Sequence, residues 1–219
     1  MVSQAAEDYL KSIFKLEKES TPVGTRKIAE FLKISSASVT KMLQKLEGQK
    51  LVNYASYQGV RLTKKGAGIA LATLRRHRLL ELFLKEELGY SWDEVHEEAE
   101  RLEHHVSERF VERIAEILGY PEFDPHGDPI PNEHGELPSI DSEALALVKA
   151  PQRVKICRVP DGDSELLQYL AEIRVVPGQV VQVQDQAPFQ GPLTLKIGRK
   201  TQILGWELAR KIFVSIERE

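Results

Sequence analysis

Residues 25–66 read TRKIAEFLKISSASVTKMLQKLEGQKLVNYASYQGVRLTKKG. Apolar residues recur at a helical period on both sides of the short ISS turn, which predicts two short helices. Thr25 and either Ser35 or Ser36 are the expected N-caps, because their hydroxyls can accept the first free backbone N–H groups. The end of the stretch alternates around Gln58-Gly59, which is typical of a β hairpin. Two helices followed by a hairpin predict a winged helix-turn-helix.

The second of these helices carries the expected DNA-reading surface. Val39, Leu43 and Leu46 are expected to face the core. The other side carries small residues and lysines, which permit close approach to DNA and favour phosphate at the helix N-terminus. The expected DNA contacts are Ser35, Ser36, Ala37, Ser38, Thr40, Lys41 and Lys45 in this helix, Arg61 in the wing, and Arg26 and Lys27 beside it.

The charge distribution separates the chain into blocks, although the net charge of its 219 residues is only −3. Residues 1–65 hold 12 Lys or Arg against 6 Asp or Glu, whereas residues 66–150 hold 8 against 19. All 6 histidines lie in this acidic block. A basic block favours a polyanion as partner, and an acidic block rich in histidine favours a cation.

The remaining sequence predicts a mainly α protein with a β C-terminal part. Residues 66–119 show two helical patterns that meet near Gly89. The next thirty or so residues are rich in Pro, Gly and acidic side chains, and the stretches after them alternate as strands of a small β barrel do, with one helix at SELLQYLAEI. The predicted domains are the winged helix-turn-helix at 1–65, a helical domain at 66–140, a linker at 141–152 and the barrel at 153–219.

Cellular placement is suggested by three absences. The sequence has no apolar run of about 18 residues that would span a membrane. Its first residues do not combine a basic and an apolar segment as a signal peptide does. The single cysteine, Cys157, cannot form an internal disulfide. We therefore expect a cytoplasmic protein with no membrane partner.

Val95–His105, VHEEAERLEHH, crowds three histidines and four glutamates into eleven residues. Placed on one helix, it has an apolar stripe that continues to Val106, with His and Glu side chains on the adjacent flank. Carboxylates beside a core repel each other and lose hydration, which costs several kcal/mol unless a cation or protons compensate. The segment therefore predicts a metal site.

The candidate ligands lie one helical turn apart in pairs, so that two side chains can close on one ion. Glu100 pairs in this way with Glu103 and His104. His77 and Glu81 form a similar pair on the preceding helix, and Asp8 can complete the site from the first helix. The favoured set is Asp8, His77, Glu100, Glu103 and His104. His96 is left open, and the remaining histidines at 105 and 134 are expected to be solvated.

These motifs resemble the diphtheria toxin repressor and manganese transport regulator family. The resemblance rests on EDY near the start, SSASVTKMLQKLEGQKLVNY, RRHRLLELFL and HxxxExxEHH, in that order. Residues 153–216, with LLQYLAEIRVVPGQVV and APFQGPLTL, resemble the family's SH3-like, FeoA-like barrel. The resemblance covers nearly the whole chain. It implies a homodimeric repressor that binds operator DNA when loaded with Fe(II) or Mn(II), and it makes residues 66–140 the metal-binding and dimerisation domain.

The resemblance also implies which metal is preferred. Iron-sensing members have sulfur ligands at the positions of Asp8 and Glu100, whereas carboxylates are typical of the manganese branch. Oxygen-rich ligation suits Mn(II), with Fe(II) as the alternative and other divalent metals as binders in vitro. Some manganese regulators hold a second ion close by through a glutamate where this chain has Lys11, so a tightly paired site is not expected.

Other members of the family have an ancillary site further away. Carried over by position, its ligands are Glu81, Asp124, His126 and, from the barrel, Asp161. The iron branch uses the position of His96 instead.

The expected function is metal-dependent repression of metal-uptake genes. Metal would fix the recognition helices of a dimer at the spacing of successive major grooves, about one helical turn. Two alternatives use the same residues. One is a metallohydrolase with an accessory DNA-binding domain, against which stands the absence of HExxH. The other is a metal-independent regulator that binds an organic ligand or another protein. We expect neither enzymatic activity nor an organic substrate.

Overall fold

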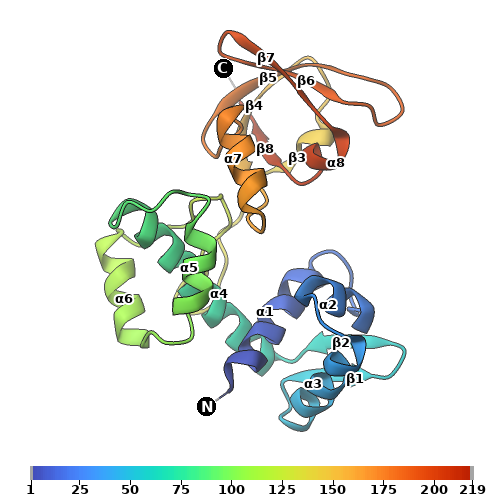
Figure 1. Cartoon of the computed structure of the whole chain (residues 1–219), viewed down its shortest axis with the longest axis vertical. Helices are drawn as coiled ribbons and strands as arrows, with labels where there is room; N and C mark the ends of the chain where they lie inside the picture. The colour runs from blue at the N-terminus through green and yellow to red at the C-terminus, as the bar shows by residue number, and fades with distance from the viewer. Residues whose placement is uncertain (1, 218–219) are drawn as a thin grey trace. The chain divides into compact units, whose positions relative to one another are not determined.

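The computed structural model describes residues 2–217, which form two compact units. The first unit contains the residues up to His77 together with Pro131–Glu136. The second contains Arg78–Ile130 and the residues from Leu137 onward. Figure 1 labels the elements of both units. None of the helices in the described part of the chain combines the length and apolar character needed to cross a membrane.

The first unit is a winged helix-turn-helix, as predicted. Ser35 caps the second helix of the motif by accepting a hydrogen bond from the backbone N–H of Ser38 at 3.2 Å. The predicted cap at Thr25 is wrong: Gly24 is the N-cap residue and Thr25 is the first helical residue. The elements are α1 (Gln4–Glu17), α2 (Thr25–Leu32), α3 (Ser36–Gly48), β1 (Val52–Ala55), β2 (Gly59–Leu62) and the first part of α4 (Lys64–Glu86).

The wing is fastened to the residue before α2 through a close backbone approach. Val23 and Val60 exchange backbone hydrogen bonds of 2.9 and 3.0 Å. Gly59 has a φ of +102°, and a Cβ there would lie 2.6 Å from the carbonyl oxygen of Val23. Glycine is needed at this position because no other residue fits both the dihedral angle and the space.

The helical part of the second unit contains the rest of α4, α5 (Val95–Leu102) and α6 (Glu108–Ile117). Two helical patterns were predicted over 66–119, and the single helix predicted for Val95–His105 is wrong. It ends at Leu102, and Ser107 caps a new helix by accepting a hydrogen bond from the Phe110 N–H at 3.2 Å. The extra break places Glu103 and His104 at the end of α5 rather than within it.

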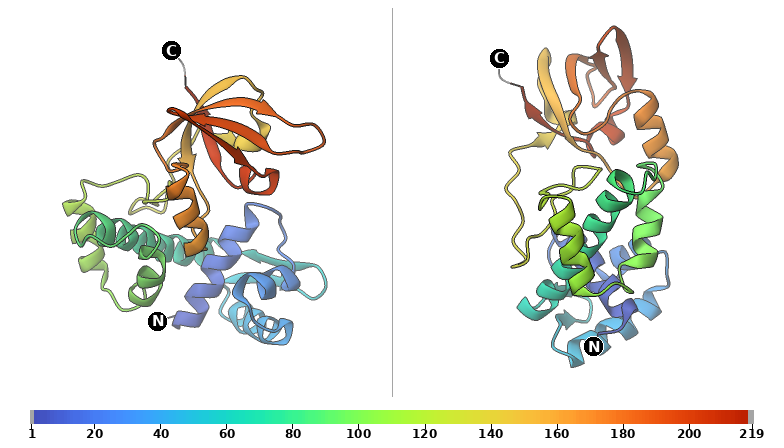
Figure 2. Two further views of the ribbon diagram at one scale, coloured as in Figure 1. Left: turned by 45° about the horizontal axis from the view of Figure 1, so that its top comes forward. Right: turned by 90° about the vertical axis from the view of Figure 1, so that its left-hand side faces the viewer.

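The C-terminal part is a six-stranded antiparallel sheet in the order β3-β8-β4-β5-β6-β7 with an apolar core. Figure 2 shows that this sheet is curled. The predicted strands and helix are present, but the sequence pattern missed β7, α8 and, within the predicted linker, β3 and η1. Leu145, within the predicted linker, is fully buried in the barrel core. The elements are β3 (Glu143–Ala144), the 3₁₀ turn η1 (Leu145–Leu147), β4 (Gln152–Arg158), α7 (Ser164–Glu172), β5 (Val180–Gln186), β6 (Leu193–Ile197), β7 (Lys200–Leu204), α8 (Trp206–Ala209) and β8 (Phe213–Ile216).

Candidate metal centre and DNA interface

Helix α3 separates a buried from an exposed face as its period predicts. Val39, Leu43 and Leu46 are fully buried. The opposite side is open to solvent, except that Thr40 is half-buried and its hydroxyl donates to the Ser36 carbonyl oxygen at 3.0 Å. The exposed residues of the predicted DNA surface in and before this helix are Ser35, Ser36, Ala37, Ser38, Lys41 and Lys45.

The cations of the predicted DNA surface fall into two groups. Arg26 forms an ion pair of 2.8 Å with Glu30, and Lys27 forms one of 2.8 Å with Glu19. Lys41, Lys45 and Arg61 have no ion-pair partner within residues 2–217. The recognition helix and the wing therefore offer uncompensated positive charge, whereas Arg26 and Lys27 would have to exchange a carboxylate for a phosphate.

The five residues of the predicted primary site belong to both units. In the first unit, Asp8 is half-buried on α1 and His77 is buried on α4.

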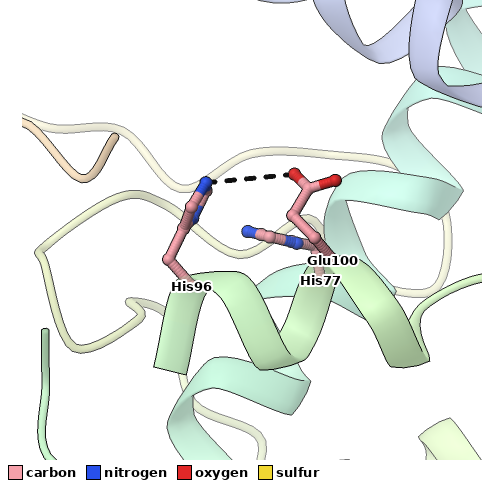
Figure 3. Close-up of side chains that lie close together, drawn as sticks. All are labelled: His77, His96 and Glu100. Atoms are coloured by element: carbon pink, nitrogen blue, oxygen red, sulfur yellow. Dashed lines mark ion pairs between the residues drawn. The ribbon is translucent and has the colours of Figure 1, made fainter. Parts of the chain in front are cut away.

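The other three, Glu100, Glu103 and His104, lie at the C-terminal end of α5 in the second unit. Glu103 is fully buried, and its Oε1 lies 3.3 Å from Nε2 of His104. Oε1 of Glu100 is 4.0 Å from Nε2 of His96, one turn earlier on α5 (Figure 3). Helix α5 and the two residues after it therefore carry two pairs of an imidazole and a carboxylate, His96 with Glu100 and His104 with Glu103.

A second cluster is built entirely within the second unit, from segments far apart in sequence. Glu81 on α4 has ligand atoms within 4.8 Å of those of Asp124 and His126, and all three residues are buried. Glu81 also lies within the same limit of His96 and of Asp161 from the barrel. The structure thus places the residues of the predicted ancillary site in two groups that share Glu81.

The imidazole of His126 is oriented as in a metal ligand. Its Nε2 is 2.8 Å from the backbone carbonyl oxygen of Trp92, so Nε2 carries the proton and donates. Nδ1 is then the basic nitrogen; it is buried, has no hydrogen-bond partner in the described chain, and lies 4.0 Å from Oε1 of Glu81. A histidine that donates one ring N–H to a carbonyl and leaves the other nitrogen free is the usual arrangement at a metal.

Asp124 completes this cluster with one engaged and one available oxygen. Its Oδ1 accepts the backbone N–H groups of His126 and Asp128 at 2.8 and 2.9 Å. Its buried Oδ2 has no hydrogen-bond partner in residues 2–217 and lies 3.5 Å from Nε of Arg78. Burial raises the pKa of Asp124 well above its ordinary value, and the charges of Glu81 and Asp128 raise it further, while Arg78 lowers it. A bound cation would relieve this repulsion.

Two contributors to this centre were missed from the sequence. Arg78 is buried beside the cluster, and its guanidinium forms ion pairs with Asp124 and Asp128 and donates to the Pro129 carbonyl oxygen. Trp92 supplies the carbonyl that orients His126, and its ring lies 5.6 Å from that imidazole. In the sequence, the only sign of a buried role for Arg78 is that it directly precedes the apolar pair Leu79-Leu80.

The donor set of both groups fits a divalent cation. Imidazole nitrogens and carboxylate oxygens are ligands for first-row metals, and sulfur is absent from these positions. Lys11, where a closely paired second ion would need a carboxylate, is 5% exposed.

Comparisons with known protein families match almost the whole chain. Residues 1–60 match the N-terminal DNA-binding domain of iron-dependent repressors, and residues 63–132 match their metal-binding and dimerisation domain. Residues 144–216 match the FeoA domain. The order of the three matches is the order predicted from the motifs.

Among individual relatives, the names mention both iron and manganese. The iron-dependent repressor IdeR of Mycobacterium tuberculosis is 34% identical over 95% of both chains. The regulator MntR of Bacillus subtilis is 36% identical over 57% of this chain and 87% of its own. A solved manganese-dependent transcriptional repressor in complex with manganese has a TM-score of 0.90 at 38% identity, covering 97% of this chain and 100% of its own. All three relatives are regulators of transcription by name.

Proposed function

The chain belongs to the diphtheria toxin repressor and manganese transport regulator family of metal-dependent transcriptional repressors, and we propose that it represses metal-uptake genes when loaded with Mn(II). The observation that carries the metal dependence is the buried set of Glu81, Asp124 and His126. Such a set is costly to bury without a cation. The preference for Mn(II) rests on carboxylates at Asp8 and Glu100, since oxygen ligands suit Mn(II).

We propose two sets of metal ligands, a primary and an ancillary set. The ancillary ligands are supported by the short distances and by the available Nδ1 of His126. The primary set is supported by the burial of His77 and Glu103 and by the partial burial of the others. The proposed primary ligands are Asp8, His77, Glu100, Glu103 and His104; the ancillary ligands are Glu81, Asp124, His126 and Asp161, with His96 beside them.

Repressors of this family act as dimers on operator DNA, and we propose that this chain forms a homodimer in the cytoplasm. Phe110 and Ile117 lie on one side of α6 and are 47% and 61% exposed, which is expected of an apolar surface that a second copy covers. A bound ion would favour the DNA-competent state of the protein through its higher affinity for that state. By reciprocity, operator DNA would tighten metal binding.

The two alternative functions predict different observations. A hydrolase would have to turn over a substrate, and the relatives matched are repressors rather than enzymes. A metal-independent regulator would bind DNA equally well in chelator. Fe(II) is the second candidate metal, since the relative IdeR is named as iron-dependent.

The test is DNA binding to the region upstream of the protein's own gene, in EDTA and then in graded Mn(II), Fe(II) and Zn(II). We expect binding only with metal, with Mn(II) acting at the lowest concentrations relevant to a cell. Equal binding in EDTA would contradict the proposed function. Stronger activation by Fe(II) than by Mn(II) would still support a metal-dependent repressor, but one whose metal is Fe(II).

The ancillary site has its own prediction. Asp124→Asn removes one carboxylate charge from the buried cluster, so the number of Mn(II) ions bound per chain should fall by about one, with on the order of 10- to 100-fold weaker affinity at that site. Equilibrium dialysis with metal analysis measures this. Asp141→Asn, an exposed carboxyl in the same connecting stretch, is the matched control and should bind as the wild type does. An unchanged stoichiometry in Asp124→Asn would remove the residue from the ligand set.

A further inference from the structure

The barrel carries a basic surface that the proposed metal and operator sites do not use. Its cations are Arg153 on β4, Lys196 on β6, Arg199 and Lys200 at the β6–β7 turn, and Arg174 after α7; we call this set the basic strip. All five are exposed. In the sheet, Arg153 is paired with Gln182 of β5, which is paired in turn with Lys196. Directly paired residues share a face of a sheet, so Arg153 and Lys196 point to the same side, two strands and roughly 10 Å apart.

Two neighbouring hollows lie along this strip. One, of about 350 Å³, is lined by Arg174, Arg199 and Lys200. The other, of about 460 Å³, is lined by Arg153 and Lys196, and the two share Gly198 at the turn. Glu172 is the one acidic residue lining either hollow. The surface is therefore concave and strongly positive.

The strip also lacks the internal neutralisation found elsewhere on the surface. Some exposed arginines on helices of this chain do have carboxylate partners, as Arg101 has in Glu98 at 3.2 Å and Arg113 has in Glu116. None of the five cations of the strip has an ion-pair partner within the described part of the chain. In this they match Lys41, Lys45 and Arg61 of the DNA-binding unit. Neighbouring cations without partners repel each other, and a polyanion removes that cost.

We propose that the basic strip binds the phosphate backbone of duplex DNA, as a second, sequence-independent contact of the repressor. The inference rests on the proposed function, because the DNA-binding unit of the same chain is what brings the protein to a duplex. Tethering raises the effective concentration of a second binding surface without any new specificity. DNA fits better than a single small anion because the cations are spread over two strands, a turn and the end of α7. Successive phosphates of a duplex can each contact one of these cations.

The experiment measures how the affinity of the Mn(II)-loaded full chain for duplex DNA depends on salt. Each phosphate contact contributes about −0.9 to the slope of log K against log salt. The double variant Arg199→Gln/Lys200→Gln should have a slope less steep by about 2, and Arg174→Gln by about 1. Both changes should appear on operator and non-operator duplexes alike, because phosphates carry no sequence information.

Arg210→Gln/Lys211→Gln is the control, an exposed Arg-Lys pair beyond the far end of β7 whose arginine pairs with Glu207 at 3.4 Å. It removes the same charge and should leave the slope unchanged. Lys41→Gln in the recognition helix is the positive reference, with an expected change of about 1. A wild-type slope in Arg199→Gln/Lys200→Gln, or an equal change in the control pair, would overturn the basic strip as a DNA contact. A wild-type protein whose DNA binding does not depend on metal would instead overturn the proposed function.

Discussion

Glu103→Ala is expected to abolish metal-dependent DNA binding while leaving the protein folded. The Glu103 side chain is fully buried, and its Oε1 lies 3.3 Å from Nε2 of His104. If both are ligands of the primary ion, the substitution removes a charged oxygen donor and leaves the ion fewer contacts than it needs. We expect a metal response weaker by at least 100-fold, since even partners of ligands cost about 10- to 100-fold. Titration of operator DNA with Mn(II), followed by fluorescence anisotropy, measures the effect.

The control for this prediction is Glu97→Ala, which removes a glutamate from the exposed side of the same helix. Glu97 is 74% exposed and pairs with Arg101 at 3.6 Å, so its loss should change neither metal nor DNA binding. Circular dichroism would show that both variants keep the helical content of the wild type. A Glu103→Ala protein that still responds to Mn(II) at wild-type concentrations would remove Glu103 from the primary site.

Arg78→Ala should destabilise the metal-free protein by about 3–5 kcal/mol, because it breaks a buried ion-pair network. The Arg78 side chain is 3% exposed, and it faces Asp124 and Asp128, whose side chains are 0% and 13% exposed. Without the guanidinium, these carboxyls and Glu81 would be left without the cation that offsets their repulsion. The pKa of Asp124, already raised by burial, would rise further. Urea unfolding in EDTA measures the change in the free energy of unfolding.

Arg101→Ala is the matched substitution on the surface. Its guanidinium is 70% exposed and pairs with Glu97 and Glu98, so its loss should cost less than about 1 kcal/mol. Added Mn(II) should restore part of the stability of Arg78→Ala by binding the same carboxylates. Equal stability of the Arg78→Ala and Arg101→Ala proteins would mean that the buried pairs contribute nothing to folding.

The predictions from sequence were most successful where local periodicity decides the structure. The spacing of Val39, Leu43 and Leu46 gave the buried face of α3 correctly, and the alternation around Gln58-Gly59 gave the wing. The same reasoning failed at Val95–His105, where the apolar stripe of the sequence continues to Val106 although the helix does not. The helix ends at Leu102, because Ser107 starts a new helix with a side-chain cap, and a cap is a weaker signal than a stripe.

The candidate ligands also divide into those that local periodicity predicts and those that it does not. His96 and Glu100, or His77 and Glu81, could be paired from the sequence because a helix places residues four apart on one side. No spacing relates Glu81 to Asp124, His126 and Asp161, and their assignment came from the family resemblance. The buried role of Arg78 and the orienting carbonyl of Trp92 were missed, since neither follows from residue type.

The sequence by itself therefore determined the order of the domains, the faces of the helices and the kinds of side chain available to a metal and to DNA. These follow from backbone geometry that repeats every 3.6 or every 2 residues and needs no distant partner. Only the tertiary structure decided which nitrogen of His126 is available, which oxygen of Asp124 is engaged, and which cations form the basic strip. Those properties depend on contacts between segments tens of residues apart, and the free energy of packing the whole unit selects them.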